Sequence, residues 1–321
     1  MNAVMEAPLV KKFRIIGQSR VALALVGLLL LCVFLAIISP HFLTLTNILN
    51  VLRQVSIIAI VAVGMTYVII TAGIDLSVGS VLALSSVAIA LLLNRGINIF
   101  LSIGVGLLLG AFLGYINSIL ITSRIGMPPF IATLAMMSIA RGLTMVVTGG
   151  RPIYGLPESF GFIGGGYLLG IPFPVIVMIL VFIVGHVNLA YTIRGTHIYA
   201  VGGNPDATRL SGIDINKVKR NTYMISGLTS ALAGVILASR LTSVEPLSGL
   251  GYELDAIAAA VIGGASFFGG EGSLLGTFIG ALIMGVLRNG LNLLDVSTYW
   301  QQVVIGFVIA ATVAIGTFRS K

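Results

Sequence analysis

Long apolar runs recur along the whole chain, separated by short polar or glycine-rich segments. A run of about 18 or more apolar residues is long enough to cross the hydrocarbon core of a membrane as a helix. The pattern predicts about ten membrane-spanning helices, with expected ranges 21–38, 53–71, 77–93, 97–121, 128–148, 172–189, 221–240, 254–270, 273–289 and 298–316. We therefore expect an all-α integral membrane protein whose single transmembrane domain covers 21–316.

The composition agrees with lipid as the main solvent of this chain. Of its 321 residues, 57% are hydrophobic and only 9% are charged, whereas a soluble domain carries about 25% charged residues. The formal net charge of +8 does not indicate nucleic-acid binding, because the basic residues lie in short segments between the apolar runs. That placement is typical of a membrane protein oriented by the positive-inside rule.

The distribution of basic residues predicts the orientation of the spans. With the N-terminus inside, 12 of the 18 lysines and arginines fall in segments expected to be cytoplasmic. The tails over 1–20 and 317–321 then both lie in the cytoplasm, as an even number of spans requires. Two longer polar segments follow from the same assignment: 149–171 outside and 190–220 inside.

An internal repeat is visible in two glycine-rich stretches. Residues 106–114 read GLLLGAFLG and residues 272–280 read GSLLGTFIG, with six of nine positions identical. They lie in the fourth and ninth predicted spans and would run in opposite directions, as in transporters built from two inverted five-helix halves. Chance similarity between Gly- and Leu-rich helices is the alternative. Glycines four residues apart also allow close helix packing, within the chain or across a dimer.

A polar stretch, GIDLSVGS over 73–80, separates the second and third spans. Asp75 is suited to capping the following helix, and an ionisable group at membrane depth is also a candidate for a gate or transport pathway. Both interpretations remain open. The full set of gate or pathway candidates is Asp75, Ser77, Asn117, Thr133, Glu253 and Asp255.

The inside segment contains one predicted short helix. Asn204-Pro205 followed by Asp206 is typical of a helix start, and Leu210-Ser211-Gly212 is typical of its end. A short amphipathic helix at this place can rest on the lipid surface or dock into another protein, and the residues alone do not decide between these uses.

Catalytic and nucleotide-binding patterns are absent from the sequence. The glycine-dense stretch over 263–273 lacks the Gly-Lys-Ser/Thr ending of a phosphate-binding loop, and that ending occurs nowhere in the chain. The three histidines are scattered, with no metal-binding spacing. We therefore expect no catalytic residue, cofactor or metal in this chain, and any ATP and magnesium to be used by a partner.

Several stretches together resemble the permease subunits of bacterial ribose-type ABC importers, in the branched-chain amino acid/sugar permease superfamily. They are GIDLSVGS (73–80), PFIATL (129–134), GGNPDATRLSGI (202–213), GYELDAIAA (251–259) and NGLNLL (289–294). The resemblance covers almost the whole chain after residue 20. Glu271 departs from it, since many relatives carry a basic residue there, and so does Ala265, where Thr is frequent. These departures leave the identity of the sugar open, with ribose favoured among monosaccharides.

The resemblance implies a type II importer-like fold in the bacterial inner membrane and several partners. These are a second permease copy, expected to form a homodimer, ATPase subunits on the cytoplasmic side and an extracytoplasmic sugar-binding protein. The loop that couples to the ATPase matches 202–213, with candidate residues Gly203, Asn204, Asp206, Ala207, Arg209, Leu210 and Gly212. The binding protein is expected to dock on 149–171 and 241–253, with candidates Arg151, Glu158 and Glu245.

Three other classes of function remain open at this point. An ion-coupled secondary sugar transporter would work as a lone chain, although Asp75, Asp255 and Glu271 near span ends argue against proton coupling. An ABC permease of the same superfamily for nucleosides or amino acids would share the same motifs. A membrane scaffold without transport is the weakest alternative, because uncharged polar residues are distributed through the spans.

Overall fold

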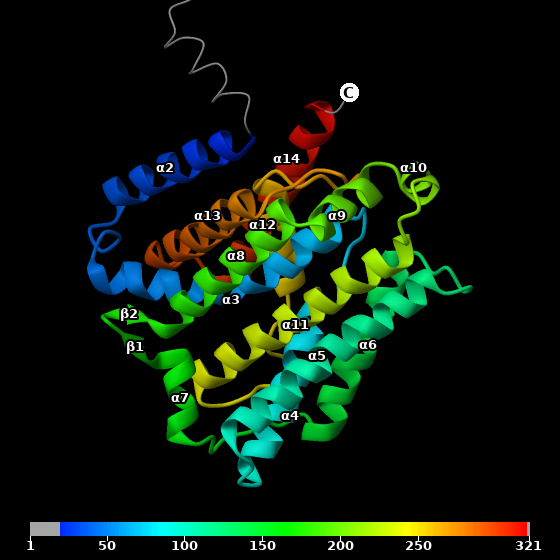
Figure 1. Cartoon of the computed structure of the whole chain (residues 1–321). Helices are drawn as coiled ribbons and strands as arrows, with labels where there is room; N and C mark the ends of the chain where they lie inside the picture. Colours follow the sequence, from blue (N-terminus) through cyan, green and yellow to red (C-terminus); the bar gives the residue numbers. More distant parts are fainter. Residues whose placement is uncertain (1–19, 320–321) are drawn as a thin grey trace, which may run out of the picture.

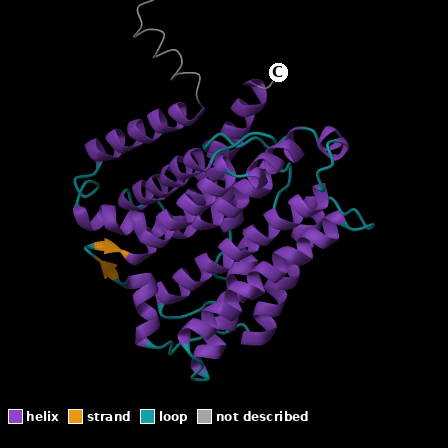
Figure 2. Ribbon diagram, viewed as in Figure 1, coloured by secondary structure: helices purple, strands orange, loops and turns teal. Residues whose placement is uncertain are grey.

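A computed structural model describes residues 20–319 of the chain as an α-helical bundle with one small hairpin (Figures 1 and 2). In chain order the helices are α2 (Arg20–Ile38), α3 (Leu45–Ile70), α4 (Val78–Asn94), α5 (Ile99–Thr122), α6 (Pro129–Thr148), α7 (Glu158–Gly165), α8 (Phe173–Tyr191), α9 (Ile193–Gly203), α10 (Pro205–Leu210), α11 (Ile215–Leu241), α12 (Tyr252–Ile262), α13 (Leu274–Leu293) and α14 (Thr298–Arg319). Strands β1 (Tyr167–Leu168) and β2 (Ile171–Pro172) pair antiparallel. Most of the predicted tails, 1–20 and 317–321, lies outside the described residues or at their edge.

The described part confirms the all-α membrane class. Seven of its helices are long and apolar enough to cross a membrane: α2, α3, α5, α6, α8, α11 and α13. Helix α4 is a shorter apolar helix of 17 residues. The chain is therefore a multi-pass membrane protein, while the count of ten spans stays a prediction.

Helix α12 corrects one predicted span. The run over 254–270 was expected to be one helix, but α12 ends at Ile262 and has 11 residues. Gly263 and Gly264 follow, and Gly264 has φ +98°, a conformation that glycine adopts without a steric penalty. At 1.5 Å per residue α12 is about 17 Å long, roughly half of a hydrocarbon core. The glycine pair therefore makes α12 an interrupted helix.

Helices α3 and α11 form the centre of the bundle, where they cross its middle (Figure 1). Two-thirds of the apolar window of each is buried inside the protein, against 11% for α2, where four leucines (Leu23, Leu25, Leu29 and Leu30) are exposed, as expected for a lipid-facing surface. A Cβ on Gly110 of α5 would overlap the carbonyl oxygen of Gly227 in α11. A Cβ on Gly280 of α13 would likewise overlap the carbonyl oxygen of Ala259 in α12. Both glycine stripes therefore pack within the chain.

The two polar segments contain more regular structure than the sequence predicted. The short helix expected within 190–220 is present as α10, and a further helix not predicted from the sequence, α9, precedes it. Its buried residues, Gly195, Ile198, Val201 and Gly202, recur at helical spacing. The segment 149–171 folds into α7 and the start of the hairpin. Figure 1 places α10 and the hairpin at opposite ends of the bundle, which we call the α10 end and the hairpin end.

Candidate functional site

The N-terminal turns of α4 and α12 meet inside the bundle. A Cβ on Gly79, in the first turn of α4, would overlap the carbonyl oxygen of Gly249 and lie 2.6 Å from Oε2 of Glu253, in the first turn of α12. The absence of a side chain at Gly79 therefore allows the N-terminal turns of α4 and α12 to touch. Helix N-termini carry a partial positive charge, and both of these turns are rich in acidic or hydroxyl side chains.

Asp75 is the centre of a buried hydrogen-bond network before α4. Its side chain is 1% exposed. Its carboxylate accepts hydrogen bonds from the backbone N–H of Ser77 at 3.0 Å, from the Ser77 hydroxyl at 2.6 Å and from the Ser226 hydroxyl of α11 at 2.7 Å. The Asn117 amide of α5 donates to the Ser77 hydroxyl at 2.9 Å. Asp75 thus binds the backbone that leads into α4 and also links this turn to α5 and α11.

A second polar group surrounds the start of α12. Arg288 of α13 donates to both carboxylate oxygens of Asp255, at 2.8 and 2.7 Å. Asp255 is 1% exposed and the Arg288 side chain is 31% exposed. Arg141 of α6 donates to the carbonyl oxygens of Pro246 and Ser248, at 2.6 and 3.0 Å. Cationic side chains therefore fix both α12 and the loop that precedes it.

The predicted gate and pathway residues fall into three places. Asp75, Ser77 and Asn117 form one network, and Thr133 of α6 joins the same turn by donating to the carbonyl oxygen of Ile74 at 3.2 Å. Glu253 lies beside the first turn of α4, and its carboxylate accepts from the N–H of Gly251 at 3.2 Å. Asp255 points instead to α13.

Sequence reasoning missed three residues of this region as site candidates: Ser226, Arg141 and Arg288. A repeated pattern signals the region itself, since Gly73-Ile-Asp75-Leu precedes α4 and Gly251-Tyr-Glu253-Leu opens α12. This Gly-x-acidic-Leu pattern marks the two turns at which α4 and α12 begin. No sequence spacing points to the arginines, because α6 and α13 reach the site through the tertiary fold.

At the α10 end, α9 packs against the end of α3. A Cβ on Gly202 would overlap the carbonyl oxygen of Ile70, the last residue of α3, and this oxygen accepts a hydrogen bond from the N–H of Gly270 at 2.8 Å. The Tyr199 hydroxyl of α9 donates to the carbonyl oxygen of Gly272 at 2.7 Å. Burial raises the pKa of the Tyr199 phenol, so the hydroxyl stays protonated as a donor. These contacts connect α9 directly to the interior helices.

The predicted short helix is confirmed as α10. The Asn204 side chain caps it by accepting from the N–H of Ala207 at 2.9 Å, and Gly212 follows its end with φ +80°. Three of its side chains are almost fully solvent-facing: Asp206 is 91% exposed, Arg209 71% and Leu210 89%. The other two coupling candidates, Gly203 and Ala207, are exposed as well. Together these exposed side chains form a surface at the α10 end of the bundle.

The three predicted docking residues at the hairpin end, Arg151, Glu158 and Glu245, are all exposed. Two backbone hydrogen bonds of 2.9 Å between Ile153 and Val244 hold the segments of Arg151 and Glu245 side by side. Residues distant in sequence therefore share one surface there.

Within residues 20–319, no group of three or more His, Cys, Asp or Glu side chains is placed to hold a metal ion. The geometry is that of a helical membrane bundle with a buried polar centre and an exposed helix at one end. A family model for the permease component of the branched-chain amino acid transport system matches residues 47–313. The chain belongs to this permease family.

Individual relatives of this permease are named for sugars. The ribose import permease protein of Haemophilus influenzae is 50% identical over 292 residues, covering 90% of each chain. The ribose import permease protein of Bacillus subtilis is 52% identical over 296 residues, covering 92% of each chain. The D-allose transport system permease protein of Escherichia coli is 40% identical over 294 residues, covering 91% of this chain and 90% of that one. No solved structure gives a significant match.

Proposed function

We propose that this permease is the membrane-spanning subunit of an ATP-binding-cassette importer for a monosaccharide, with ribose as its principal substrate. The observation that carries the proposal is the 50–52% identity to ribose import permeases over about nine-tenths of both chains. ATP and magnesium are used by a partner ATPase, since the sequence carries no phosphate-binding loop.

The membrane arrangement belongs to the same proposal. Ten spans form two inverted halves of five, counting the shorter helices α4 and α12 as members. The directions of α5 and α13, which carry the two repeated stretches, support this. Helix α13 begins after the turn over 263–273, which contacts α9 at the α10 end. Helix α5 begins at the other end of the bundle, just after Asn94 of α4, whose side chain donates to the carbonyl oxygen of Tyr154. Both termini lie in the cytoplasm with α10, and the protein resides in the bacterial inner membrane.

The working mechanism assigns one partner to each end of the bundle. An ATPase subunit docks on α10, and its movement passes through α9 to the end of α3 by way of the Gly202 contact. An extracytoplasmic sugar-binding protein docks on the surface of Arg151, Glu158 and Glu245. Two copies of the permease face each other, and the sugar passes between them. ATP drives the cycle by favouring one of the two arrangements of the bundle over the other.

Substrate class is tested by competition. The permease is reconstituted in liposomes with its ATPase and binding protein, and ATP-driven uptake of labelled ribose is measured with unlabelled competitors in excess. We expect ribose to compete best, and D-allose to be the strongest other sugar because of the 40% identical D-allose permease. Competition by nucleosides or amino acids, with none by sugars, would assign the chain to another branch of the superfamily.

The role of α10 is tested by Asp206→Ala combined with Arg209→Ala. Both side chains are exposed, so the bundle is expected to keep its stability while uptake is lost and ATP hydrolysis no longer responds to the loaded binding protein. Arg95→Ala, at an exposed residue that belongs neither to the α10 end nor to the proposed docking surface, is the control for ATPase coupling. Normal uptake by the α10 variant would remove the coupling role from this helix.

A further inference from the structure

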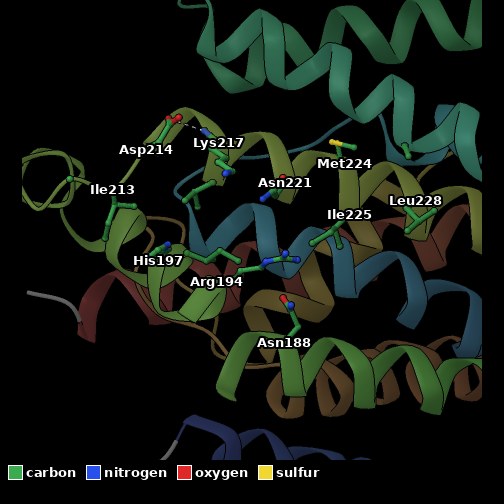
Figure 3. A pocket seen from close by; sticks show the side chains of 14 residues that line it. Asn188, Arg194, His197, Ile213, Asp214, Lys217, Asn221, Met224, Ile225 and Leu228 are labelled. Carbon is green, nitrogen blue, oxygen red and sulfur yellow. Dashed lines mark hydrogen bonds between the residues drawn. The ribbon is translucent and has the colours of Figure 1, made fainter. Parts of the chain in front are cut away.

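A cavity of about 930 Å³ lies between α11 and the α8–α9 corner, apart from the polar centre. Figure 3 shows Asn188, Arg194 and His197 on one side of it, facing side chains of α11 on the other. Its volume lies in the range of ligand-binding pockets, about 300–1,000 Å³. Neither the docking surfaces nor the contact between α4 and α12 accounts for this cavity.

The lining changes from charged to apolar along α11. Lys217 and Asn221 line the cavity near the start of the helix, and Met224, Ile225 and Leu228 line it further in. From Lys217 to Leu228 the helix rises about 16 Å, at 1.5 Å per residue. The charged part of the cavity therefore lies at the α10 end. The apolar part extends along α11 toward the middle of the membrane, at the depth where lipid surrounds the bundle.

The charged part has the chemistry of a phosphate site. Arg194 and Lys217 approach the cavity from different helices, and His197 lines it on the same side as Arg194. The one lining carboxylate, Asp214, caps α11 by accepting from the backbone N–H of Lys217 at 3.0 Å. Arginine and lysine are the side chains that bind phosphate oxygens most effectively.

We propose that this cavity binds an anionic phospholipid, with its phosphate held by Arg194 and Lys217 and its upper acyl chain along Met224, Ile225 and Leu228. A free anion would leave the apolar part unfilled, and a neutral sugar would not use the two cations. Basic pockets between membrane helices on the cytoplasmic side are suited to anionic lipid headgroups. The occupant is therefore a lipid that enters from the surrounding bilayer.

The bound lipid also contacts both segments that flank α10. His197 and Ile198 precede α10 in α9, and Gly212 and Ile213 follow it, and all four line the cavity. An occupied cavity therefore restrains the position of α10 from both sides. This regulatory consequence rests on the proposed coupling role of α10, whereas lipid binding itself does not.

The test measures lipid bound to the purified full chain by native mass spectrometry. Phosphatidylglycerol and phosphatidylcholine with the same acyl chains are compared, with glycerol phosphate as the free headgroup. We expect preferential retention of phosphatidylglycerol, and about 25-fold weaker binding in Arg194→Gln/Lys217→Gln, from roughly fivefold per basic residue. Arg95→Gln/Arg151→Gln removes two exposed charges outside the cavity and is expected to bind as the unaltered chain does.

Three results would overturn the proposal: equal retention of the two lipids, equal loss in both double variants, or equally tight binding of glycerol phosphate. A thermal unfolding scan in detergent identifies any variant that does not fold. As a second probe, Leu228→Trp fills the apolar part without altering charge and is expected to reduce phosphatidylglycerol retention at least fivefold. Lipid retention as expected, together with no ATP-driven sugar uptake when the chain is reconstituted with its ATPase and binding protein, would refute the proposed function and leave the lipid site standing.

Discussion

The ion pair between Asp255 and Arg288 is expected to be the most sensitive side-chain contact of α12. Replacing Arg288 with methionine keeps much of the side-chain volume but leaves the carboxylate of Asp255, which is 1% exposed, without its cation. Breaking a buried pair in this way costs about 3–5 kcal/mol. A Coulomb attraction of about 4 kcal/mol, for charges 4 Å apart at an effective dielectric constant of 20, has the same size.

The reverse substitution is expected to cost less. Asp255→Asn removes the carboxylate that Arg288 binds, but the Arg288 side chain is already 31% exposed in the unaltered chain. Its guanidinium can therefore extend into water while its apolar part stays packed against the protein. In Asp255→Asn/Arg288→Met neither charge remains, and the double variant is expected to be more stable than Arg288→Met alone. The two substitutions are therefore non-additive.

The free energy of unfolding in detergent micelles, measured by denaturant titration, gives the four corners of this double-mutant cycle. Arg95→Met, at an exposed arginine at the end of α4, is the control and is expected to lie within about 0.5 kcal/mol of the unaltered chain. Equal stability of Arg288→Met and Arg95→Met, or simple additivity in the cycle, would refute the assignment of a buried ion pair to α12.

Two other contacts lead to predictions with matched controls. Gly202→Ala places a methyl group against the last carbonyl of α3 and is expected to lower ATP-driven uptake several-fold. Gly142→Ala in α6, where an added Cβ has nothing within 4 Å, is expected to be neutral, and equal uptake by both variants would contradict the close contact. Ser226→Ala removes a donor to the buried Asp75 carboxylate and is expected to cost about 1.5–3 kcal/mol of unfolding free energy. The exposed Ser138→Ala is its control, and matching denaturation midpoints would show that Asp75 does not need this hydrogen bond.

The sequence predicted the elements whose signals are local. Apolar length identified the long spans, and Asn204-Pro205 with Gly212 identified α10 almost to the residue. The same reasoning extended α12 past Ile262, because a run of small and apolar residues remains hydrophobic after the helix has ended. The glycines that interrupt it also occur inside true spans such as α5, so residue type alone does not distinguish a break from a packing contact.

The site was predictable only in part for a related reason. Asp75 and Ser77 lie two residues apart, and a turn before a helix makes their interaction foreseeable. Ser226 and Arg288 reach the polar centre through packing of helices that are far apart in the sequence, and one polar residue in a span is most often a helix-to-helix hydrogen bond. Their partners became identifiable only from the fold.

The most direct test of the account compares two energy sources for uptake of labelled ribose into proteoliposomes. One preparation holds the permease with its ATPase and binding protein, with or without ATP, and the other holds the permease alone under a proton or sodium gradient. The account predicts uptake only by the complete assembly and only with ATP. Uptake by the lone chain under an ion gradient would contradict it, identify a secondary transporter and leave α10 without its proposed partner.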